Sequence, residues 1–340
     1  MKKILITGGA GFIAHHIIAH IIKNTDWDIV TLDRLDLSGN LNRLHEILYE
    51  FSAKDKKRLK VVFHDLKAEI NSQIKSELGT PDMILHLAAA SHVDRSIIYP
   101  MEFVLDNVVG TVNLLDFARS LKNLEKFVYF STDEIFGNAP EGVSYKEYDR
   151  YNSTNPYSAS KASAEEFCVA YENTYKLPIL ISHTMNVFGE RQHPEKFIPM
   201  TIQRVRDSEK VFIHANKEKT KAGSRHYIHA QDVADGLMFI LSLKDYKHQG
   251  DFGNAKCPKF NLVGPEEINN LDLAQKIANV QKRELIYELI DNHSSRPGHD
   301  LRYSLSPNLL KSLGWEPKIK LSKRIEEVVD WSLKNERWLT

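Results

Sequence analysis

The sequence predicts an α/β protein with a doubly wound parallel sheet and a second, smaller lobe in its C-terminal part. Apolar, β-branched runs alternate with helical patterns over the first 183 residues. Such alternation is typical of parallel strands that are covered by helices on both faces. Beyond residue 183 the alternation fades into loops and short helices. A chain of 340 residues is long enough for one large domain or for two lobes.

The individual elements follow from short apolar runs and from the helical spacing between them. Strands are predicted at 3–7, 28–33, 60–64, 82–87, 126–131 and 178–183. Helices are predicted at 11–23, 40–50, 68–78, 100–120 and 157–175. A further strand and helix are predicted within 227–243.

The first strand runs into a glycine-rich turn that contains Gly8 and Gly11, and a helical pattern starts at once with Phe12 and Ile13. Glycines let the backbone approach a pyrophosphate, and a helix N-terminus supplies N–H donors and a positive dipole. Asp33 ends the second strand, where a carboxylate accepts hydrogen bonds from an adenosine ribose and repels a 2′-phosphate. A simple turn residue is the alternative reading of Asp33. The pattern predicts a Rossmann-type domain that prefers NAD to NADP.

These signals give the expected domain organisation. Residues 1–183 form the NAD-binding Rossmann domain, and 226–252 return to it. Residues 184–225 and 253–340 form a discontinuous substrate-binding lobe. Ligands of open α/β sheets bind beyond the carboxyl ends of the strands, so we expect the active site there.

Five groups that can move protons or bind an alkoxide lie close together in the sequence. Thr132, Asp133 and Glu134 follow the fifth predicted strand, and Tyr157 and Lys161 lie one turn apart on the following helix. A strand end and a helix can bring such side chains to one substrate carbon. A solvated loop followed by an amphipathic helix is the alternative, and the glycine-rich start of the chain argues against it.

Together these features resemble the extended short-chain dehydrogenase/reductase family, and within it the dTDP-glucose 4,6-dehydratase group. The matching stretches are GGAGFI at 8–13, LDRL with SGNL at 32–41, HLAAASHVDRSI at 86–97, NVVGTVNLL at 107–115, STDEIFG at 131–137, NPYSASKASAE at 155–165, NVFG at 186–189, PEKFIP at 194–199 and RPGHDLRY at 296–303. The doublet Asp133-Glu134 is the specific part. Related epimerases and decarboxylases usually lack both acids, and mannose-type dehydratases have the Glu without the Asp.

The resemblance implies a role for each catalytic group in a redox-neutral dehydration of a nucleotide-diphosphate glucose. Tyr157 takes the proton of the 4-hydroxyl as C4 is oxidised by NAD⁺, and Thr132 binds the 4-oxygen. Lys161 and the nicotinamide charge favour the phenolate, which a free tyrosine with a pKa near 10 needs. Glu134 removes the C5 proton, Asp133 protonates the departing C6 hydroxyl, and hydride returns to C6. The product is the 4-keto-6-deoxy sugar nucleotide.

The resemblance also implies the binding residues. The cofactor residues are Gly8, Gly11, Phe12, Ile13, Asp33, Asp65, Leu66, Ala88, Ala90, Tyr157 and Lys161. The substrate residues are Ser91, His92, Asp94, Asn186, Glu195, Lys196, Phe197, Arg225 and Arg296. The two arginines suit a diphosphate because a guanidinium is planar and bidentate, and surface ion pairs are the alternative for them. A turn residue is the alternative for Asp65.

Five positions depart from the family pattern: Ala14, His15, Asp106, His183 and Met185. Ala14 replaces a glycine for which alanine is tolerated, and Asp106 stands where a threonine near the nicotinamide is usual. The departures leave the nucleotide base open, with dTDP-glucose first and UDP- or CDP-glucose as alternatives. A nucleotide-sugar 4-epimerase is a further alternative, and so is a non-catalytic NAD-sensing module.

Composition narrows the classes of partner. The 45 basic and 45 acidic residues give no net charge, so we expect neither nucleic acid nor a membrane as partner. Two cysteines form no disulfide framework, and the histidines show no metal-ligand spacing, so no metal is expected. The N-terminal apolar run is too short for a signal peptide, so a cytoplasmic location is expected.

A homodimer is expected from two of the helices. The segments 100–120 and 157–175 carry apolar residues beyond one buried stripe, and a helix of this kind often packs against a partner. The resemblance implies pairing through a four-helix bundle.

Overall fold

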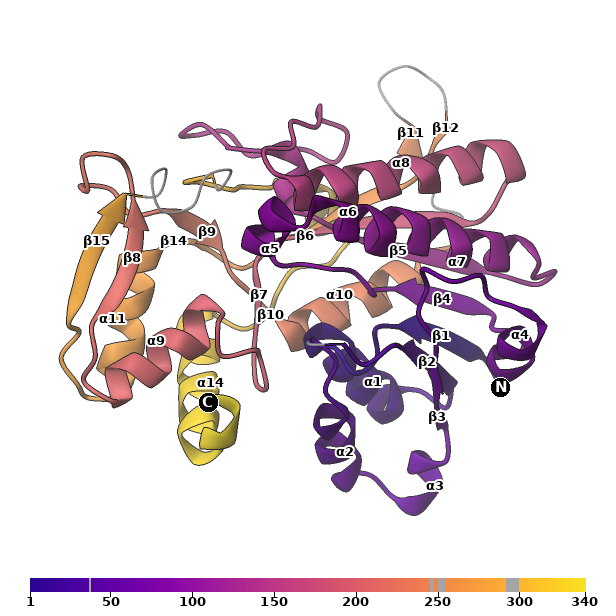
Figure 1. The fold of residues 1–340 in the computed structure, drawn as a ribbon, viewed down its shortest axis with the longest axis horizontal. Helices are drawn as coiled ribbons and strands as arrows, with labels where there is room; N and C mark the ends of the chain where they lie inside the picture. The colour runs from indigo at the N-terminus through magenta and orange to yellow at the C-terminus, as the bar shows by residue number, and fades with distance from the viewer. Residues whose placement is uncertain (37, 245–247, 250–254, 292–299) are drawn as a thin grey trace. The chain divides into compact units, whose positions relative to one another are not determined.

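The computed structural model describes residues 1–36, 38–244, 248–249, 255–291 and 300–340, and the chain divides into two compact units (Figure 1). Unit 1 comprises 1–135, 155–183 and 237–260, and unit 2 comprises 136–154, 184–236 and 261–340. We expected the division after residue 183 and a return at 226. The segment 136–154 falls in unit 2 because its backbone bonds there: the N–H of Tyr145 donates to the carbonyl of Ser304 at 3.0 Å.

A seven-stranded sheet in the order β13-β6-β5-β4-β1-β2-β3 confirms the predicted fold class. Its strands are β1 (Lys3–Thr7), β2 (Asp28–Asp33), β3 (Leu59–Phe63), β4 (Met83–His86), β5 (Lys126–Thr132), β6 (Ile179–Thr184) and β13 (Lys259–Leu262). The pairs β3·β2, β2·β1, β1·β4 and β4·β5 are parallel. The six predicted strands are present to within a residue at each end. We missed β13, since its four residues are all buried and show no alternation.

Helices cover both faces of the unit 1 sheet, and Figure 1 shows α7 and α8 side by side on one face with α1 and α2 on the other. The helices and turns of this part are α1 (Phe12–Asn24), α2 (Leu41–Tyr49), α3 (Ala53–Lys56), α4 (Ser72–Leu78), α5 (Val93–Ile98), α6 (Pro100–Phe103), α7 (Gly110–Arg119), the 3-10 turn η2 (Asp133–Phe136) and α8 (Pro156–Tyr175). The helix α10 (Ala230–Ser242) begins in unit 2 and ends in unit 1. The short strands β11 (His248–Gln249) and β12 (Ala255–Lys256) pair antiparallel.

The predicted helix 100–120 is interrupted by a π-helical segment, η1 (Val104–Val109), between α6 and α7. Asn107 lies in this segment and is buried. Its side chain bonds both the N–H and the carbonyl of Ala90, at 2.8 and 3.0 Å. A π-bulge of this kind re-aims side chains and is frequent at functional sites. The apolar spacing of the sequence cannot distinguish it from a continuous α-helix.

Local chemistry fixes the start and the end of α8. Asn155 and Ser158 form a reciprocal capping box, and Pro156 occupies the first helical position. Lys176 ends the helix in the left-handed conformation, with φ of 59°. The cap therefore sets the position of Tyr157, which lies in the first turn.

The core of unit 1 packs aliphatic and aromatic side chains of the sheet against α7 and α8. Leu5, Leu114 and Phe127 are fully buried and belong to one apolar cluster. At about 25 cal/mol per Å² of apolar surface removed from water, such burial is the main force that holds the helices on the sheet.

Unit 2 has two apolar cores of its own. Its strands are β7 (Val187–Phe188), β8 (Val211–Ala215), β9 (Ser224–His226), β10 (Ile228–His229), β14 (Glu267–Asn269) and β15 (Tyr287–Asp291). Its helices are α9 (Phe197–Arg206), α11 (Asn270–Val280), α13 (Asn308–Ser312), α14 (Leu321–Lys334) and the 3-10 turn η3 (Glu336–Trp338). Within the described ranges, no helix is both long and apolar enough to span a bilayer.

Candidate active site and cofactor pocket

The turn between β1 and α1 requires glycine. Gly8 has φ of 73°, and a Cβ on it would lie 3.0 Å from Cα of Ala88. A Cβ on Gly9 would overlap the side chain of Thr31, which lies on β2. The turn is closed by the N–H of Gly11, which donates to the carbonyl of Gly8 at 2.8 Å. Gly11 is the N-cap of α1 and offers no side-chain cap, so the N–H groups of the first turn remain for an anionic ligand.

A pocket in unit 1 opens along this turn. It is lined by Gly8, Gly11, Leu32, Asp33, Arg34, Asp36, Ser38, Gly39, His64, Asp65, Leu66, Leu87, Ala88, Ala89, Ala90 and Asp106. Seven of the expected cofactor residues line it: Gly8, Gly11, Asp33, Asp65, Leu66, Ala88 and Ala90. Phe12 and Ile13 are the first residues of α1. The strand ends and the glycine turn thus gather at one site, as a dinucleotide requires.

Asp33 is held rigidly at the end of β2. One carboxylate oxygen accepts from the N–H of Ala10 at 2.9 Å and the other accepts from the N–H of Leu35 at 2.8 Å. A carboxylate has about four acceptor sites, so both oxygens can still accept from ribose hydroxyls. The fixed negative charge at this position disfavours a 2′-phosphate.

A buried chain of hydrogen bonds supports the pocket wall, and sequence reasoning missed it. The N–H groups of Leu87 and Ala88 donate to the hydroxyl of Thr7 at 3.2 and 3.0 Å. That hydroxyl lies 2.8 Å from Nδ1 of His86, and Nε2 of His86 lies 2.9 Å from Oγ1 of Thr111. Because Thr7 already accepts two bonds, it donates its proton to Nδ1, and His86 carries its own proton on Nε2.

The acidic doublet Asp133-Glu134 follows β5 directly. Thr132 donates to a carboxylate oxygen of Asp133 at 3.1 Å, and the N–H of Glu134 donates to the Thr132 hydroxyl at 3.3 Å. Asn155, the cap of α8, donates to Glu134 at 3.4 Å. Thr132 and Asp133 are buried, with 8% and 4% of their surface exposed. The 3-10 turn at Asp133 places both acids at the carboxyl end of the sheet.

Tyr157 joins this group from α8. It is 8% exposed, and its ring packs edge-on against Phe103 with centroids 6.3 Å apart. Burial raises the pKa of Tyr157 above its ordinary value, the nearby carboxylates of Glu134 and Asp133 raise it further, and a hydrogen bond with Thr132 opposes them. The hydrogen bond with Thr132 and the electrostatic effects of Glu134 and Asp133 indicate that these three side chains lie near Tyr157.

Lys161 lies one turn further along α8 and is buried. Its ammonium donates to the carbonyl of Phe130 at 2.7 Å and lies 4.3 Å from the ring centroid of Tyr129. Burial lowers the pKa of Lys161 to about 8. We expected Lys161 to favour the phenolate of Tyr157, but in the chain by itself burial and the two acids dominate.

Residues 5–328 match the family model described as GDP-mannose 4,6 dehydratase. The chain belongs to this family. A dTDP-glucose 4,6-dehydratase of Escherichia coli is 33% identical over 99% of this chain and 95% of the relative. The dTDP-D-glucose 4,6-dehydratase of Mus musculus is 32% identical over 98% of this chain and 89% of the relative.

Solved structures agree with this family assignment. The dTDP-glucose 4,6-dehydratase of Bacillus anthracis in complex with NAD has a TM-score of 0.84 at 27% identity and covers 99% of this chain and 98% of its own. A Thermus thermophilus UDP-glucose 4-epimerase in complex with NAD has a TM-score of 0.82 at 26% identity, over 97% and 98% of the two chains. The resemblance to extended short-chain dehydrogenases/reductases is therefore confirmed.

The residues expected on the sugar side are divided between the units of this dehydratase-family chain. In unit 1, Ser91 precedes α5, His92 is its N-cap, and Asp94 lies in its first turn. In unit 2, Asn186 precedes β7, while Glu195, Lys196 and Phe197 lead into α9. The Oδ1 atom of Asn186 is buried and has no hydrogen-bond partner among the described residues. A buried acceptor of this kind is suited to a ligand hydroxyl.

Of the two arginines expected at the diphosphate, Arg225 lies within the described residues. Arg225 lies on β9, donates to the carbonyls of Asp300 and Leu301 at 3.0 and 2.7 Å, and stacks on Tyr303 with 4.6 Å to the ring centroid. Arg296 lies outside the described residues.

The departures from the family pattern are accommodated in different ways. His183 is fully buried and bonds Glu165 of α8 at 3.1 Å, and Lys259 of β13 bonds the same carboxylate at 2.8 Å. This cluster ties α8 to β6 and β13, so it positions the helix of Tyr157 and Lys161. Met185 is buried.

Arg34, Asp36 and Asp106 line the pocket but were not among the expected cofactor residues. Asp106 was noted only as a departure. The sequence offers one signal for Asp36, which lies three residues after Asp33 at the end of β2, whereas Asp106 lies inside η1 and has no such neighbour.

Proposed function

We propose that this protein is an NAD-dependent nucleotide-diphosphate-glucose 4,6-dehydratase that acts on dTDP-glucose. The observation that carries the proposal is the pair Asp133 and Glu134, gathered with Thr132 and Tyr157 at the end of β5. Two acids in addition to the Tyr are needed for elimination and not for oxidation alone. The dTDP-glucose 4,6-dehydratases among the relatives support the choice of substrate.

The pocket fits the adenosine diphosphate half of NAD. The open N–H groups of α1, the close approach at Gly8 and the carboxylate of Asp33 are what a pyrophosphate and a ribose diol need. Asp65, Leu66, Ala88 and Ala90 form the rest of the wall. When bound, NAD⁺ supplies the hydride acceptor for C4 and the hydride donor for C6 of the sugar.

The chain's own residues supply the proton chemistry. Tyr157 removes the proton of the 4-hydroxyl while Thr132 holds the 4-oxygen by a hydrogen bond. Once C4 is a ketone, the C5 hydrogen is acidic, and Glu134 removes it. Asp133 donates a proton to the departing C6 hydroxyl, which leaves as water. Such positioned acids and bases typically contribute about 10²–10⁴ in rate each.

The protonation of Tyr157 sets a condition on the first step. Its pKa is raised by burial and by the acids, so the neutral phenol is the resting form of the chain by itself. The phenolate becomes accessible when a positive charge enters the adjacent pocket, because an opposite charge stabilises the ionised form. Proton abstraction is therefore coupled to occupation of the pocket.

The expected substrate residues of unit 1 are Ser91, His92 and Asp94, and those of unit 2 are Asn186, Glu195, Lys196, Phe197, Arg225 and Arg296. UDP-glucose and CDP-glucose remain alternative substrates because Met185 and His183 depart from the family pattern.

The deciding experiment is a panel of dTDP-, UDP-, CDP- and GDP-glucose, each incubated with the purified protein and analysed by mass spectrometry. We expect a product from dTDP-glucose that is lighter by one water and carries a 4-keto group. A sugar deuterated at C4 should give a product with deuterium at C6. Tyr157→Phe serves as the inactive control.

Two other outcomes would reject the proposal. A product of unchanged mass with inverted C4 would identify a 4-epimerase, the activity named for one of the similar solved structures. Bound NAD without turnover of any sugar nucleotide would identify a sensing module.

A further inference from the structure

An arginine directly follows Asp33, at the place where many dinucleotide-binding proteins receive a 2′-phosphate. Arg34 and Asp33 both line the pocket. An arginine near the end of β2 accommodates the 2′-phosphate of NADP, whereas an acidic residue selects NAD. The sequence therefore carries opposite signals at two adjacent positions, and the surroundings of Arg34 decide between them.

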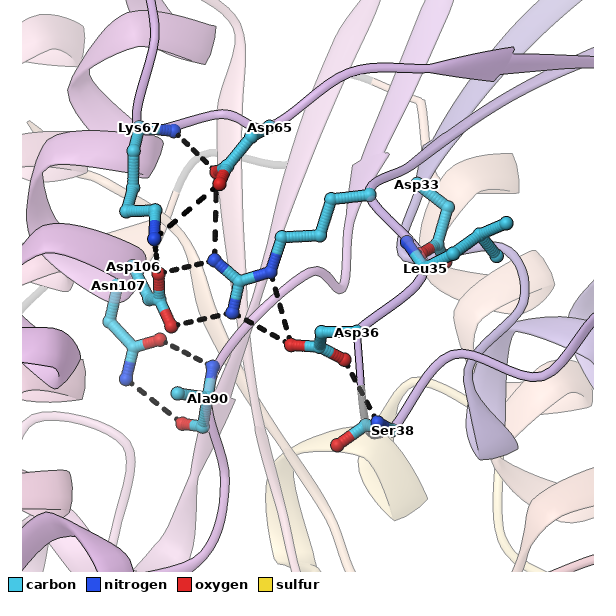
Figure 2. A network of polar contacts seen from close by, with 10 residues as sticks. Asp33, Leu35, Asp36, Ser38, Asp65, Lys67, Ala90, Asp106 and Asn107 are labelled. Atoms are coloured by element: carbon cyan, nitrogen blue, oxygen red, sulfur yellow. Dashed lines mark hydrogen bonds and ion pairs between the residues drawn. The ribbon is translucent and has the colours of Figure 1, made fainter.

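The guanidinium of Arg34 is fully engaged by neighbouring carboxylates. Nη1 and Nη2 donate to the two oxygens of Asp106 at 2.5 and 2.7 Å, in a bidentate pair. Nε and Nη2 donate to Asp36 at 3.1 and 2.7 Å. Asp65 lies 3.5 Å from Nη1. Figure 2 shows Asp36, Asp65 and Asp106 pointing toward this central group.

Asp106 is the anchor of the cluster because it is the most buried of these carboxylates. Its side chain is 9% exposed, compared with 40% for Asp36 and 38% for Asp65. It sits in the π-helical segment next to Asn107, whose bonds to Ala90 fix the backbone. A bidentate Arg–carboxylate pair in a partly buried place is stronger than an exposed one.

Four carboxylates, those of Asp33, Asp36, Asp65 and Asp106, gather at this end of the pocket. Lys67 pairs with two of them, 3.4 Å from Asp65 and 3.7 Å from Asp106. This concentration of carboxylates disfavours a phosphate dianion.

We propose that Asp106 determines cofactor specificity by holding Arg34 in an ion pair, so that Arg34 cannot bind the 2′-phosphate of NADP. The proposal rests on the proposed NAD dependence and adds a second element to it. Asp33 repels the 2′-phosphate directly. Asp106 pairs with Arg34, whose positive charge would otherwise offset that repulsion by binding the phosphate. Arg34 is thus a latent receptor for the 2′-phosphate.

The test is the Asp106→Asn variant, which keeps the shape and one acceptor oxygen but removes the charge. Purified protein is incubated with equal, excess NAD⁺ and NADP⁺, washed, and denatured, and the released nucleotides are quantified. We expect the ratio of NADP⁺ to NAD⁺ to rise by about tenfold or more over the unmodified protein, since a charge-assisted bond to phosphate becomes available. Titration calorimetry with each nucleotide should give the same change in the ratio of Kd values.

Two further variants separate the ion pair from a general change in charge. Asp116→Asn removes the same charge from α7, where the side chain is half exposed and does not line the pocket, and should leave the ratio unchanged. Arg34→Gln combined with Asp106→Asn should return the ratio to that of Arg34→Gln alone.

Each result decides the inference. A ratio that does not move in Asp106→Asn, or that rises equally without Arg34, would overturn it. If Asp106→Asn does not fold, Asp36→Asn, which frees Nε of the same guanidinium, should raise the ratio in the same direction, and an unchanged ratio there would also overturn it. Absence of any dinucleotide from the unmodified protein would instead reject the proposed function.

Discussion

Asp133 and Glu134 have adjacent positions but different surroundings. Asp133 is buried and accepts from Thr132, whereas Glu134 is partly exposed and accepts from Asn155. Two carboxyl groups in different environments can act as an acid and a base at the same pH. This difference underlies the separate roles we propose for them.

Substitution of these acids should divide the reaction into its parts. Glu134→Gln should abolish exchange of the C5 hydrogen with solvent, and Asp133→Asn should slow loss of water, each by about 10²–10⁴. Both variants should still bind NAD and oxidise C4, because Tyr157 and Lys161 are unchanged. The measurement is NMR of the sugar in D₂O together with absorbance of the reduced cofactor. Undiminished C5 exchange in Glu134→Gln would reassign the base.

His86 makes the stability of the protein depend on pH. Burial lowers its pKa from 6.5 to about 3, with a smaller contribution from the charge of Lys161. The unfolded chain therefore binds a proton between pH 6.5 and 3 that the folded chain does not, so stability falls as the pH falls through this window. The loss should be on the order of 3 kcal/mol by pH 4.

We expect His86→Gln to reduce this loss, although it lowers stability at neutral pH. Urea denaturation between pH 7.5 and 4 measures the slope, and His45→Gln, at an exposed position on α2, is the matched control. An equal acid-induced loss in the His86 variant and in the unmodified protein would show that other groups cause it.

Elements were predicted well where their cause is local and poorly where it is not. The alternation of apolar runs placed six strands of the sheet, and helical spacing placed α8 at 157–175, one residue short of its observed start at Pro156. The π-helical segment contains Asn107, whose side chain bonds Ala90, 17 residues earlier in the chain. The seventh strand, β13, depends on β6 as its neighbour. Tertiary contacts of this kind leave no periodic signal.

The cap of α8 should matter for both stability and activity. Asn155→Ala removes the capping box and the bond to Glu134, and a lost cap typically costs about 1 kcal/mol. Asn155→Ser should restore most of the stability, since serine is also a good cap, but it lacks the amide N–H for Glu134. Urea denaturation and C5 exchange, measured on both variants, separate the two effects. Equal C5 exchange in Asn155→Ser and in the unmodified protein would show that the amide is not needed.

At the scale of the whole molecule, the two units divide the expected site residues. The glycine-rich turn and the five groups expected to be catalytic were predicted from the sequence as two motifs, because their spacing and residue types are specific. The cluster around Arg34 was not predicted, since nothing in the sequence indicates that its three acids meet at one side chain. Only the fold brings Asp36, Asp65 and Asp106 to one guanidinium.

The homodimer remains a prediction. In the structure, some apolar residues of the two helical segments are buried in the core, and others are exposed and available for a partner. Leu114, Leu115 and Phe117, which lie in the segment 100–120, belong to the core of unit 1. Other apolar side chains on the same helices are exposed: Met101 by 64%, and Phe167 by 42%. We propose that a second copy covers them.

Light scattering should give twice the mass of one chain at micromolar concentration. Phe167→Glu should lower this mass toward that of one chain, because a charge in an apolar interface is unpaired. Tyr49→Glu, at a 69% exposed position on α2, is the control and should leave the dimer intact. The mass of a single chain for the unmodified protein would contradict the prediction.

The hydrogen bonds below the glycine turn have a spectroscopic consequence. The N–H groups of Leu87 and Ala88 donate to Thr7, so Thr7 donates to Nδ1 of His86. The Nε2 proton of His86 therefore lies in a buried hydrogen bond to Thr111. Such a proton exchanges slowly with water and should give a separate downfield NMR signal at neutral pH. Because Ala88 also lines the pocket, a bound dinucleotide should shift this signal. The His86 signal thus reports whether a dinucleotide occupies the pocket, and it needs neither an added label nor a substrate.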